Sequence, residues 1–394
     1  MYNPVSIFII FFRLGCTSFG GPVAHLGYFR DEFIVRRQWM TESAMASLIA
    51  LCQFVPGPTS SQVGAAIGFQ RGGYVGATMA WLGFTLPSAL LMLFAAMFFT
   101  GQVAPDTVPW LHGLKLVAVA VVAHALWGMQ KTLCPTMATR MIALLSAALL
   151  LFFSSALAHV VVILIGAGVG CVLFKPKTAA AIPPETALPG SARRTATLLL
   201  VVFGTLLFSL PLLTQHHAAL NLFDSLFRAG ALVFGGGHVV LPLLSAELVE
   251  TQQIDTTLFI SGYALAQAVP GPLFTFATFL GAAVMPQHPI IAGALATVVI
   301  FLPGMLLLFG LLPFWQTLSR WPRVQAGLVG VNATVVGLLL STLVSPIATS
   351  AITSWYEVLI ACIGFIALTV LNVRPLIVIA LMTASYAGIA TFLY

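Results

Sequence analysis

The sequence predicts an all-α polytopic membrane protein made of two inverted-topology repeats. Three observations support this prediction: an apolar composition, internal matches at a nearly constant spacing, and opposite charge in equivalent loops. Of the 394 residues, 60% are hydrophobic and only 7% are charged, whereas a soluble domain carries about 25% charged residues. Apolar runs near the ~20 residues that span a bilayer recur along the chain. We therefore expect the lipid bilayer to be its solvent.

The internal repeat consists of four colinear matches at spacings of 214 to 216 residues. This agreement predicts two homologous halves rather than chance similarity. The matches are QFVPGP (53–58) with QAVPGP (267–272), RLGCTSFGG (13–21) with RAGALVFGG (228–236), Leu86-Pro87 with Leu302-Pro303, and Gly113-Leu114 with Gly327-Leu328. The predicted organisation is an N-terminal repeat (1–174), a polar cytoplasmic linker (175–195), a connecting transmembrane helix (196–213) and a C-terminal repeat (214–394).

Charge predicts that the repeats are inverted. The loop after the first Gly-Gly motif carries three arginines between residues 30 and 37, whereas its counterpart carries three acidic residues between 247 and 255. By the positive-inside rule these loops lie on opposite sides of the membrane. We expect a multi-pass protein of the cell inner membrane, with the N-terminus and linker in the cytoplasm and the C-terminus outside. Full spans are expected at about 74–99, 112–130, 141–156, 159–174, 196–213, 289–314, 324–344, 355–372 and 375–393.

Each repeat also holds two segments that glycine or proline must break. Segments 5–29 and 220–244 break at Gly20-Gly21-Pro22 and at Gly235-Gly236-Gly237. Segments 41–73 and 257–285 turn at Pro-Gly-Pro, and their arms are too short to span a bilayer at ~1.5 Å per residue. Re-entrant hairpins of two half-helices are predicted, with pairs of short tilted spans as the alternative. The expected structural hinges are Pro22, Pro56, Pro58, Pro270 and Pro272.

Broken helices within inverted repeats are typical of secondary transporters, whose sites lie near the midplane of the bilayer. A half-helix that begins after a break directs free N–H groups and the positive end of its dipole at such a site. The polar run Thr59-Ser60-Ser61-Gln62 follows the first Pro-Gly-Pro, whereas Leu273-Phe274 follows the second. We therefore expect an oxyanion site to which the first repeat is the main donor.

Arginines and histidines near the glycine breaks extend this prediction. Arg13 and Arg228 occupy equivalent positions in apolar surroundings, where a cation costs at least ~2.5–3.5 kcal/mol. The pair is expected to approach a common site and bind an oxyanion, or else to snorkel to an interface. His25 and His238 flank the breaks and are read either as proton-handling groups or as buried, hydrogen-bonded histidines.

Four motifs carry a resemblance to a known family: FRLGCTSFGGPVAHLGYFRDEFIVRRQWM (12–40), QFVPGPTSSQVGAAIG (53–68), FGGGHVVLPLL (234–244) and QAVPGPLFTFATFLG (267–281). They resemble the chromate transporters of the chromate ion transporter family, in the long-chain two-domain arrangement. The resemblance implies export of chromate across the inner membrane, chromate resistance, and coupling to another ion, for which a proton is a candidate. A transporter or channel for another inorganic anion such as sulfate is the alternative. Together with the motifs, it gives these expected substrate-binding residues: Arg13, Gly20, Gly21, His25, Gly57, Thr59, Ser60, Ser61, Gln62, Arg228, Gly236, Gly237, His238 and Gly271.

Other function classes find no support in the sequence. It contains no HExxH motif, no His/Asp/Glu cluster and no phosphate-binding loop, which argues against an enzyme and against ATP-driven transport. No metal or cofactor is expected, and the charges are too few to form a nucleic-acid-binding face. The oligomeric state is left open, with a homodimer as one candidate.

Overall fold

The computed structural model describes residues 3–19, 21–102, 109–153, 155–174, 190–214, 218–234, 237–315 and 321–393. Within these ranges the secondary structure is helical, with no strand. The first repeat and the connecting helix comprise α1 (Pro4–Thr17), α2 (Gly21–Arg30), η1 (Asp31–Arg36), α3 (Glu42–Phe54), α4 (Thr59–Gln102), α5 (Pro109–Leu133), α6 (Met137–Phe152), α7 (Ala156–Leu173) and α8 (Gly190–Leu213).

The second repeat has the same order of helices. Its elements are α9 (Ala218–Leu232), η4 (Gly237–Val239), α10 (Val240–Leu244), η5 (Ser245–Val249), α11 (Thr256–Ala268), η6 (Leu273–Thr275), α12 (Phe276–Val284), α13 (Pro289–Leu311), η7 (Leu312–Phe314), α15 (Pro322–Thr342), η8 (Leu343–Ala348), α16 (Thr349–Ala351), α17 (Trp355–Thr369) and α18 (Pro375–Leu393). Every predicted span coincides with a helix, to within the few residues by which helix ends vary.

The predicted breaks are also confirmed where the structure describes them; Gly20, Gly235 and Gly236 lie outside the described residues. α1 ends before the first Gly-Gly motif, and α3 ends before the first Pro-Gly-Pro. Backbone φ is positive at Gly21 (+78°), Gly57 (+133°) and Gly271 (+103°), a region that residues with a side chain rarely adopt. A second interruption at Gly72 and Gly73, where φ and ψ leave the helical range, separates the half-helix of α4 from its long span. Each repeat therefore combines broken helices with full-length ones.

Five of the described helices are long and apolar enough to cross a membrane: 59–100, 112–133, 193–213, 289–314 and 322–351. α6, α7, α17 and α18 are apolar too, but their apolar stretches are shorter. Only 6% of the apolar window of α8 is buried, so lipid must cover its large side chains, such as Phe208. The chain is a multi-pass membrane protein. α8 begins at Gly190, earlier than the expected start at 196, and the predicted linker lies outside the described residues up to 189.

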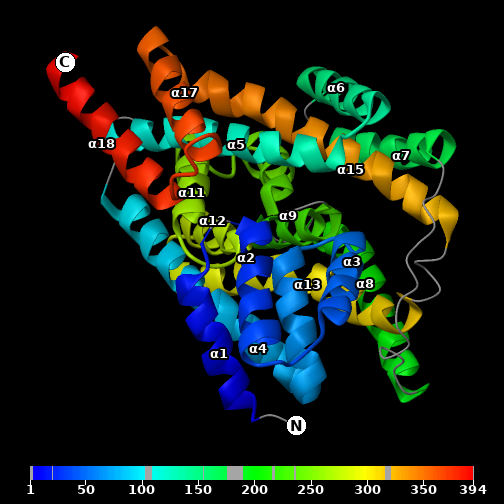
Figure 1. Ribbon diagram of the computed structural model, residues 1–394. Coiled ribbons are helices and arrows are strands. Elements are labelled where there is room, and N and C mark those ends of the chain that lie inside the picture. Colours follow the sequence, from blue (N-terminus) through cyan, green and yellow to red (C-terminus); the bar gives the residue numbers. More distant parts are fainter. Residues whose placement is uncertain are drawn as a thin grey trace.

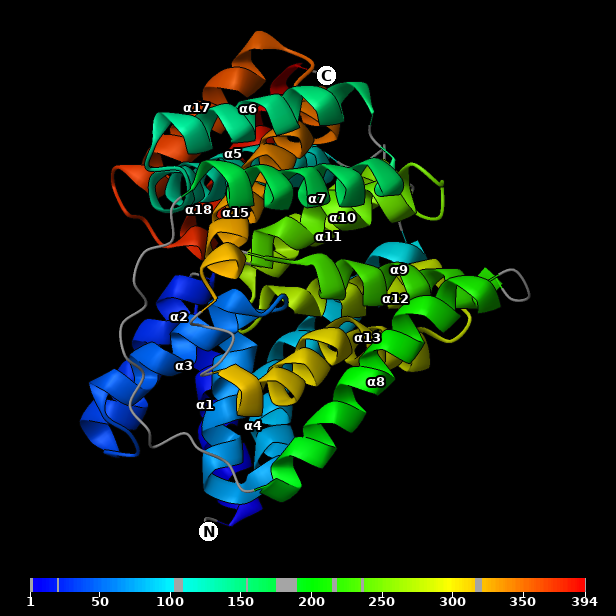
Figure 2. The ribbon, with the colours of Figure 1, turned by 90° about the vertical axis from the view of Figure 1, so that its right-hand side faces the viewer.

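The two repeats are interlocked rather than placed side by side. α6 and α7 pack against α15, whereas α17 and α18 pack against α5 (Figures 1 and 2). Because α5 and α15 are equivalent helices, the exchange is reciprocal. Glycine allows the close approach of α7 to α15: a Cβ on Gly330 would overlap the carbonyl oxygen of Gly166. The described N- and C-terminal ends lie at opposite ends of the molecule (Figure 1).

Candidate functional site

The breaks of one repeat are hydrogen-bonded to those of the other. The amide of Gly57, in the first Pro-Gly-Pro turn, donates to the carbonyl oxygen of Val233 at 2.7 Å. The amide of Gly271, in the second turn, donates to the carbonyl oxygen of Ser18 at 2.8 Å. Ser18 and Val233 are equivalent positions, each just before a Phe-Gly-Gly sequence. We call these four residues the crossing, and their pairing shows a pseudo-two-fold relation between the repeats.

Both glycines of the crossing sit where a side chain would collide. A Cβ on Gly57 would lie 2.7 Å from Gln62 Nε2 and 2.9 Å from Gly304 Cα, and one on Gly271 would lie 2.8 Å from Ser88 Oγ. Ser88 and Gly304 are themselves equivalent, each following the proline inside a long helix, α4 or α13. Each turn therefore packs against the proline-containing stretch of the other repeat's long helix.

Beside the crossing lies a group of buried polar side chains from the first repeat. His25 Nδ1 is 3.2 Å from Ser60 Oγ, and Gln62 Nε2 donates to the carbonyl oxygens of Pro56 (3.1 Å) and Gly304 (3.0 Å). Several polar atoms here have no hydrogen-bond partner within the described chain, which is unusual for buried groups and points to a bound water or ligand. They are Ser18 Oγ, His25 Nε2, Ser61 Oγ, Gln62 Oε1 and Thr85 Oγ1. We call these residues, with Ser60, the polar cluster.

A cavity of about 1,010 Å³ lies between the two repeats. One wall comes from the end of α1 and from α2, and the opposite wall from α5, from α11 before the second Pro-Gly-Pro turn and from the α17–α18 connection. Its polar lining is mixed in origin, as expected for a site shared by two repeats. The lining includes Thr17, Gly21, Tyr28, His124, Thr132, His238, Gln267, Asn372 and Arg374.

His238 presents a hydrogen-bond donor to this cavity. Its Nδ1 is 2.9 Å from the Tyr263 hydroxyl and 3.2 Å from Gln267 Nε2. Because the Gln267 amide nitrogen donates, Nδ1 accepts, and the neutral ring carries its proton on Nε2. Nε2 lies 3.9 Å from the position of a Cβ on Gly21. The histidine of the second repeat thus lies next to the glycine break of the first.

The two predicted arginines have different surroundings. Arg228 Nη2 is 2.8 Å from Asp224 Oδ2 and 2.9 Å from Glu247 Oε2, so two carboxylates already neutralise this cation. Arg13 is exposed on α1, and its guanidinium has no partner within the described chain. Neither arginine lines the cavity. The exposed cation at the cavity is Arg374, which the sequence did not single out.

The remaining predicted residues are placed as follows. Gly20 and Gly236 lie outside the described residues, Gly237 begins η4, and Pro22 lies in the first turn of α2. Thr59 is buried at the start of α4 and its hydroxyl donates to the carbonyl oxygen of Cys52 at 3.4 Å. Pro56, Pro58, Pro270 and Pro272 lie in the two turns between helices.

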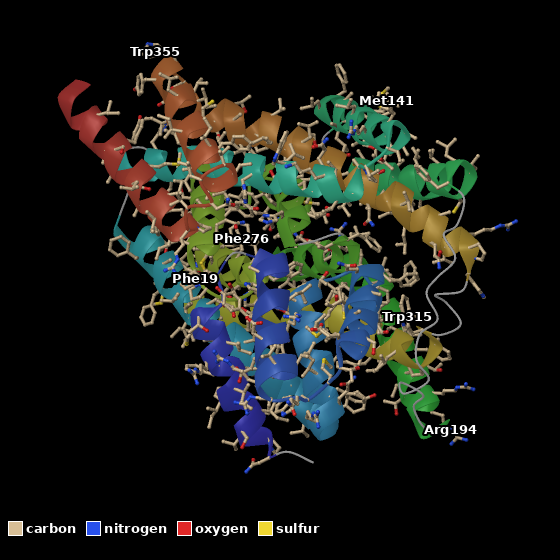
Figure 3. All side chains as sticks on the ribbon, viewed as in Figure 1. Phe19, Met141, Arg194, Phe276, Trp315 and Trp355 are labelled. Atoms are coloured by element: carbon tan, nitrogen blue, oxygen red, sulfur yellow. The ribbon has the colours of Figure 1, made fainter. Side chains whose placement is uncertain are left out.

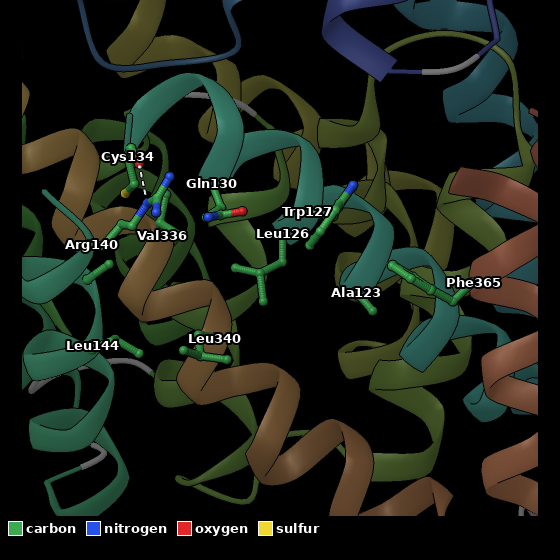
Figure 4. A pocket seen from close by; sticks show the side chains of 11 residues that line it. Ala123, Leu126, Trp127, Gln130, Cys134, Arg140, Leu144, Val336, Leu340 and Phe365 are labelled. Carbon is green, nitrogen blue, oxygen red and sulfur yellow. Dashed lines mark hydrogen bonds between the residues drawn. The ribbon is translucent and has the colours of Figure 1, made fainter. Parts of the chain in front are cut away.

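Most polar residues of the cavity were missed by sequence reasoning, among them His124, Gln267 and Arg374. The only signal was that Gln267 belongs to the repeated QxVPGP motif, and its equivalent Gln53 is exposed. A second cavity, of about 430 Å³, lies between α5, α6, α15 and α17 and is mostly apolar (Figure 4). None of its lining residues is a predicted site residue. The many side chains on the outer faces of the helices are drawn in Figure 3, among them Met141 and Trp355, which are both exposed.

Inverted repeats, broken helices that meet at a crossing and a polar cavity between the repeats define a membrane transporter rather than an enzyme. The comparison with known families makes the class specific. The profile of the chromate transporter family matches residues 5–171 and 220–389, which are the two repeats, and the chain belongs to this family.

The chain is also similar to individual transport proteins. The chain is 28% identical to an uncharacterized transporter of Methanocaldococcus jannaschii over 86% of its own length and 84% of the relative's. It is 27% identical to the chromate transport protein of Cupriavidus metallidurans (86% and 81% covered) and 27% identical to that of Pseudomonas aeruginosa (85% and 79% covered). No solved structure matches the chain significantly.

Proposed function

We propose that the chain exports chromate from the cytoplasm across the cell inner membrane by secondary active transport and thereby confers chromate resistance. The observation that carries the proposal is the cavity shared by the two repeats, whose lining combines neutral donors with one cation. A tetrahedral dianion requires several N–H and O–H donors. Family membership supports chromate as the anion.

The lining suggests a route from the cytoplasm. In the predicted topology, the α17–α18 connection and the end of α5 face the cytoplasm, so Arg374 and Thr132 lie at the cavity mouth. Arg374 attracts the dianion by its charge. Deeper in the cavity, His238 Nε2 and the Gln267 side chain replace part of the anion's hydration shell. The polar cluster, with its unpaired buried groups, is the proposed occluded site.

The fold supports alternating access. In the second repeat, α10 packs against α15. In the first repeat, the equivalent helix α2 is separated from α5 by the cavity. Two repeats of one architecture thus adopt different arrangements in one molecule. Exchange of these arrangements would close the cavity on one side and open its counterpart on the other, with the crossing as the shared pivot.

Uptake into everted membrane vesicles tests the function. The pH gradient and the membrane potential are imposed separately, and chromate uptake is measured with sulfate as a competitor. We expect saturable chromate uptake that depends on the pH gradient or on the membrane potential. Dependence on the pH gradient would identify a proton as the coupling ion. Non-saturating flux without coupling would indicate a channel, and preferred uptake of sulfate would reassign the substrate.

A further inference from the structure

An equivalent pair of charged residues makes different contacts in the two repeats. Arg13 and Glu32 of the first repeat correspond to Arg228 and Glu247 of the second, with 215 positions between the members of each correspondence. In the second repeat the pair is closed, with 2.9 Å between Arg228 Nη2 and Glu247 Oε2. It links α9 to η5, which are the two ends of the hairpin that breaks at the glycines.

In the first repeat the same pair is open. Glu32 Oε1 instead binds Arg37 Nε at 2.7 Å, and its Oε2 is 3.5 Å from Arg36 Nη1. Arg13 is exposed, with no partner for its guanidinium within the described chain. The arginine and the glutamate are thus present in both repeats, but they bind each other only in the second.

The state of the pair follows the packing of its hairpin. Ala231 and Leu243 in the second hairpin are 7% and 4% exposed, and this hairpin packs against α15. Their equivalents in the first hairpin, Cys16 and Tyr28, line the cavity, and Tyr28 is 39% exposed. A closed ion pair thus accompanies a hairpin that is packed shut, and an open pair accompanies a hairpin that faces the cavity.

We infer that Arg228–Glu247 and Arg13–Glu32 are alternating gate pairs. Arg228–Glu247 holds the hairpin of the second repeat shut in the state seen here. Arg13–Glu32 forms when the hairpin of the first repeat shuts in the opposite state. This inference rests on the alternating access proposed above. One pair is made as the other breaks, so the two states stay close in free energy and a bound anion suffices to shift the population.

Asp224 gives the second pair an additional contact. It has no acidic counterpart in the first repeat, where the equivalent residue is Ile9. Its Oδ2 lies 2.8 Å from the same Arg228 nitrogen, and the residue is 3% exposed. The second gate therefore has a carboxylate that the first lacks, which favours the state with the second hairpin shut.

Cysteine labelling tests the inference with equivalent probes. Cys16 is a native, exposed probe of the first hairpin, and Ala231→Cys places a probe at the equivalent buried position of the second. The exposed Cys171 and Cys362 are replaced by serine. The purified full-length protein in lipid nanodiscs is treated with a soluble maleimide, and labelling rates are measured at each site by mass spectrometry.

In the parent we expect Cys16 to react at least about tenfold faster than the introduced cysteine, since one is exposed and the other buried. Glu247→Gln breaks the closed pair, so labelling at position 231 should rise about tenfold while labelling of Cys16 falls. Glu247→Asp, which keeps the charge, should retain protection. Glu42→Gln is the matched control: it removes an exposed ion pair with Arg30 and should change neither rate.

Arg13→Gln is expected to affect transport without affecting labelling. Because Arg13 is unpaired in this state, both labelling rates should stay at parent values, while chromate transport in vesicles should slow because the opposite state loses its gate pair. Equal labelling of both sites in the parent, or no change at position 231 in Glu247→Gln, would overturn the inference. Labelling needs no chromate, so a labelling shift in a protein that carries another anion would leave the gates standing and would reject only the substrate.

Discussion

The amide of Gly57 donates to the carbonyl oxygen of Val233 at 2.7 Å, so the turn of one repeat is hydrogen-bonded to the break of the other. Its mirror bond, from Gly271 to Ser18, shows that the arrangement is built twice. Broken backbone at membrane depth needs partners within the protein. Here each repeat supplies them to the other, which explains why the Pro-Gly-Pro turns and the glycine breaks occur together.

The first prediction concerns the crossing itself. Gly57→Ala forces a side chain onto a backbone with φ +133° and onto Gln62 and Gly304. We expect destabilisation by about 1–3 kcal/mol and loss of chromate uptake. Thermal unfolding in detergent and vesicle uptake measure the two effects. Gly204→Ala in α8, where a Cβ meets nothing within 4 Å, is the control and should leave both unchanged; an unaffected Gly57→Ala would contradict the crossing.

The cavity lining gives a second prediction. Gln267→Ala removes both a cavity donor and the group that sets the proton of His238 on Nε2. Loss of one or two such hydrogen bonds to a dianion should raise the KM for chromate by about tenfold. Gln53→Ala changes the equivalent residue, which is exposed and does not line the cavity, and should keep the parent KM. Equal effects of the two variants would remove Gln267 from the site.

Salt dependence tests the third prediction, the role of Arg374. Because this arginine is exposed at the cavity, its attraction for a dianion should act over a Debye length and be screened by salt. Arg374→Gln should slow uptake by about threefold at low ionic strength and hardly at all at 1 M salt. Arg194→Gln, an exposed cation on α8 away from the cavity, serves as the control. A loss that is the same at every salt concentration would indicate a structural role instead.

A fourth prediction separates binding from packing in the polar cluster. Ser61 is buried and its hydroxyl has no partner within the described chain. Removing an unsatisfied buried hydroxyl should leave stability unchanged or raise it slightly. Ser61→Ala should therefore keep or increase the unfolding temperature while weakening chromate binding, measured by the chromate-dependent shift in that temperature. If the variant loses stability and keeps the shift, Ser61 is a packing residue.

The interlocked helices give a fifth prediction. Gly330→Ala inserts a methyl group where α15 meets the carbonyl of Gly166 on α7, so it should separate these helices and lower the unfolding temperature. Gly168→Ala, on the same helix α7 but in open space, should not. Both variants add one methyl group to the α7–α15 pair, Gly330→Ala inside the contact between the helices and Gly168→Ala outside it. Similar unfolding temperatures for both would argue against the exchange.

Much of the fold could be predicted from local signals, because glycine and proline decide where a helix must stop. The breaks after Thr17, Phe54 and Ala268 follow directly from them. The inverted order of the repeats follows from loop charge. The helix breaks depend on the nearest few residues, and the inverted order depends on matches between segments along the chain. Neither feature needs knowledge of the tertiary structure.

The candidate site was predictable only in part, because it depends on contacts between distant segments. Arg228 looked like a free cation, since Asp224 is one turn away and Glu247 returns to it only when the hairpin closes. His238 was identified from its place beside the glycines, whereas Arg374 reaches the cavity through the packing of α17 and α18 on α5. An alignment of the two repeats pairs equivalent residues but does not show which of the two glycine-broken hairpins is open and which is shut.

The exchange of α6 and α7 for α17 and α18 sets an order on biosynthesis. When α6 and α7 leave the translocon, their partner α15 has not yet been made, and α5 must wait longer still for α18. The first half of the chain therefore resides in the bilayer with unfilled helix surfaces until nearly the last residue is inserted. Long-range docking of this kind is slow and exposes the nascent chain to quality control. Variants in which α15 is inserted late should thus be degraded before they reach a folded state that can transport.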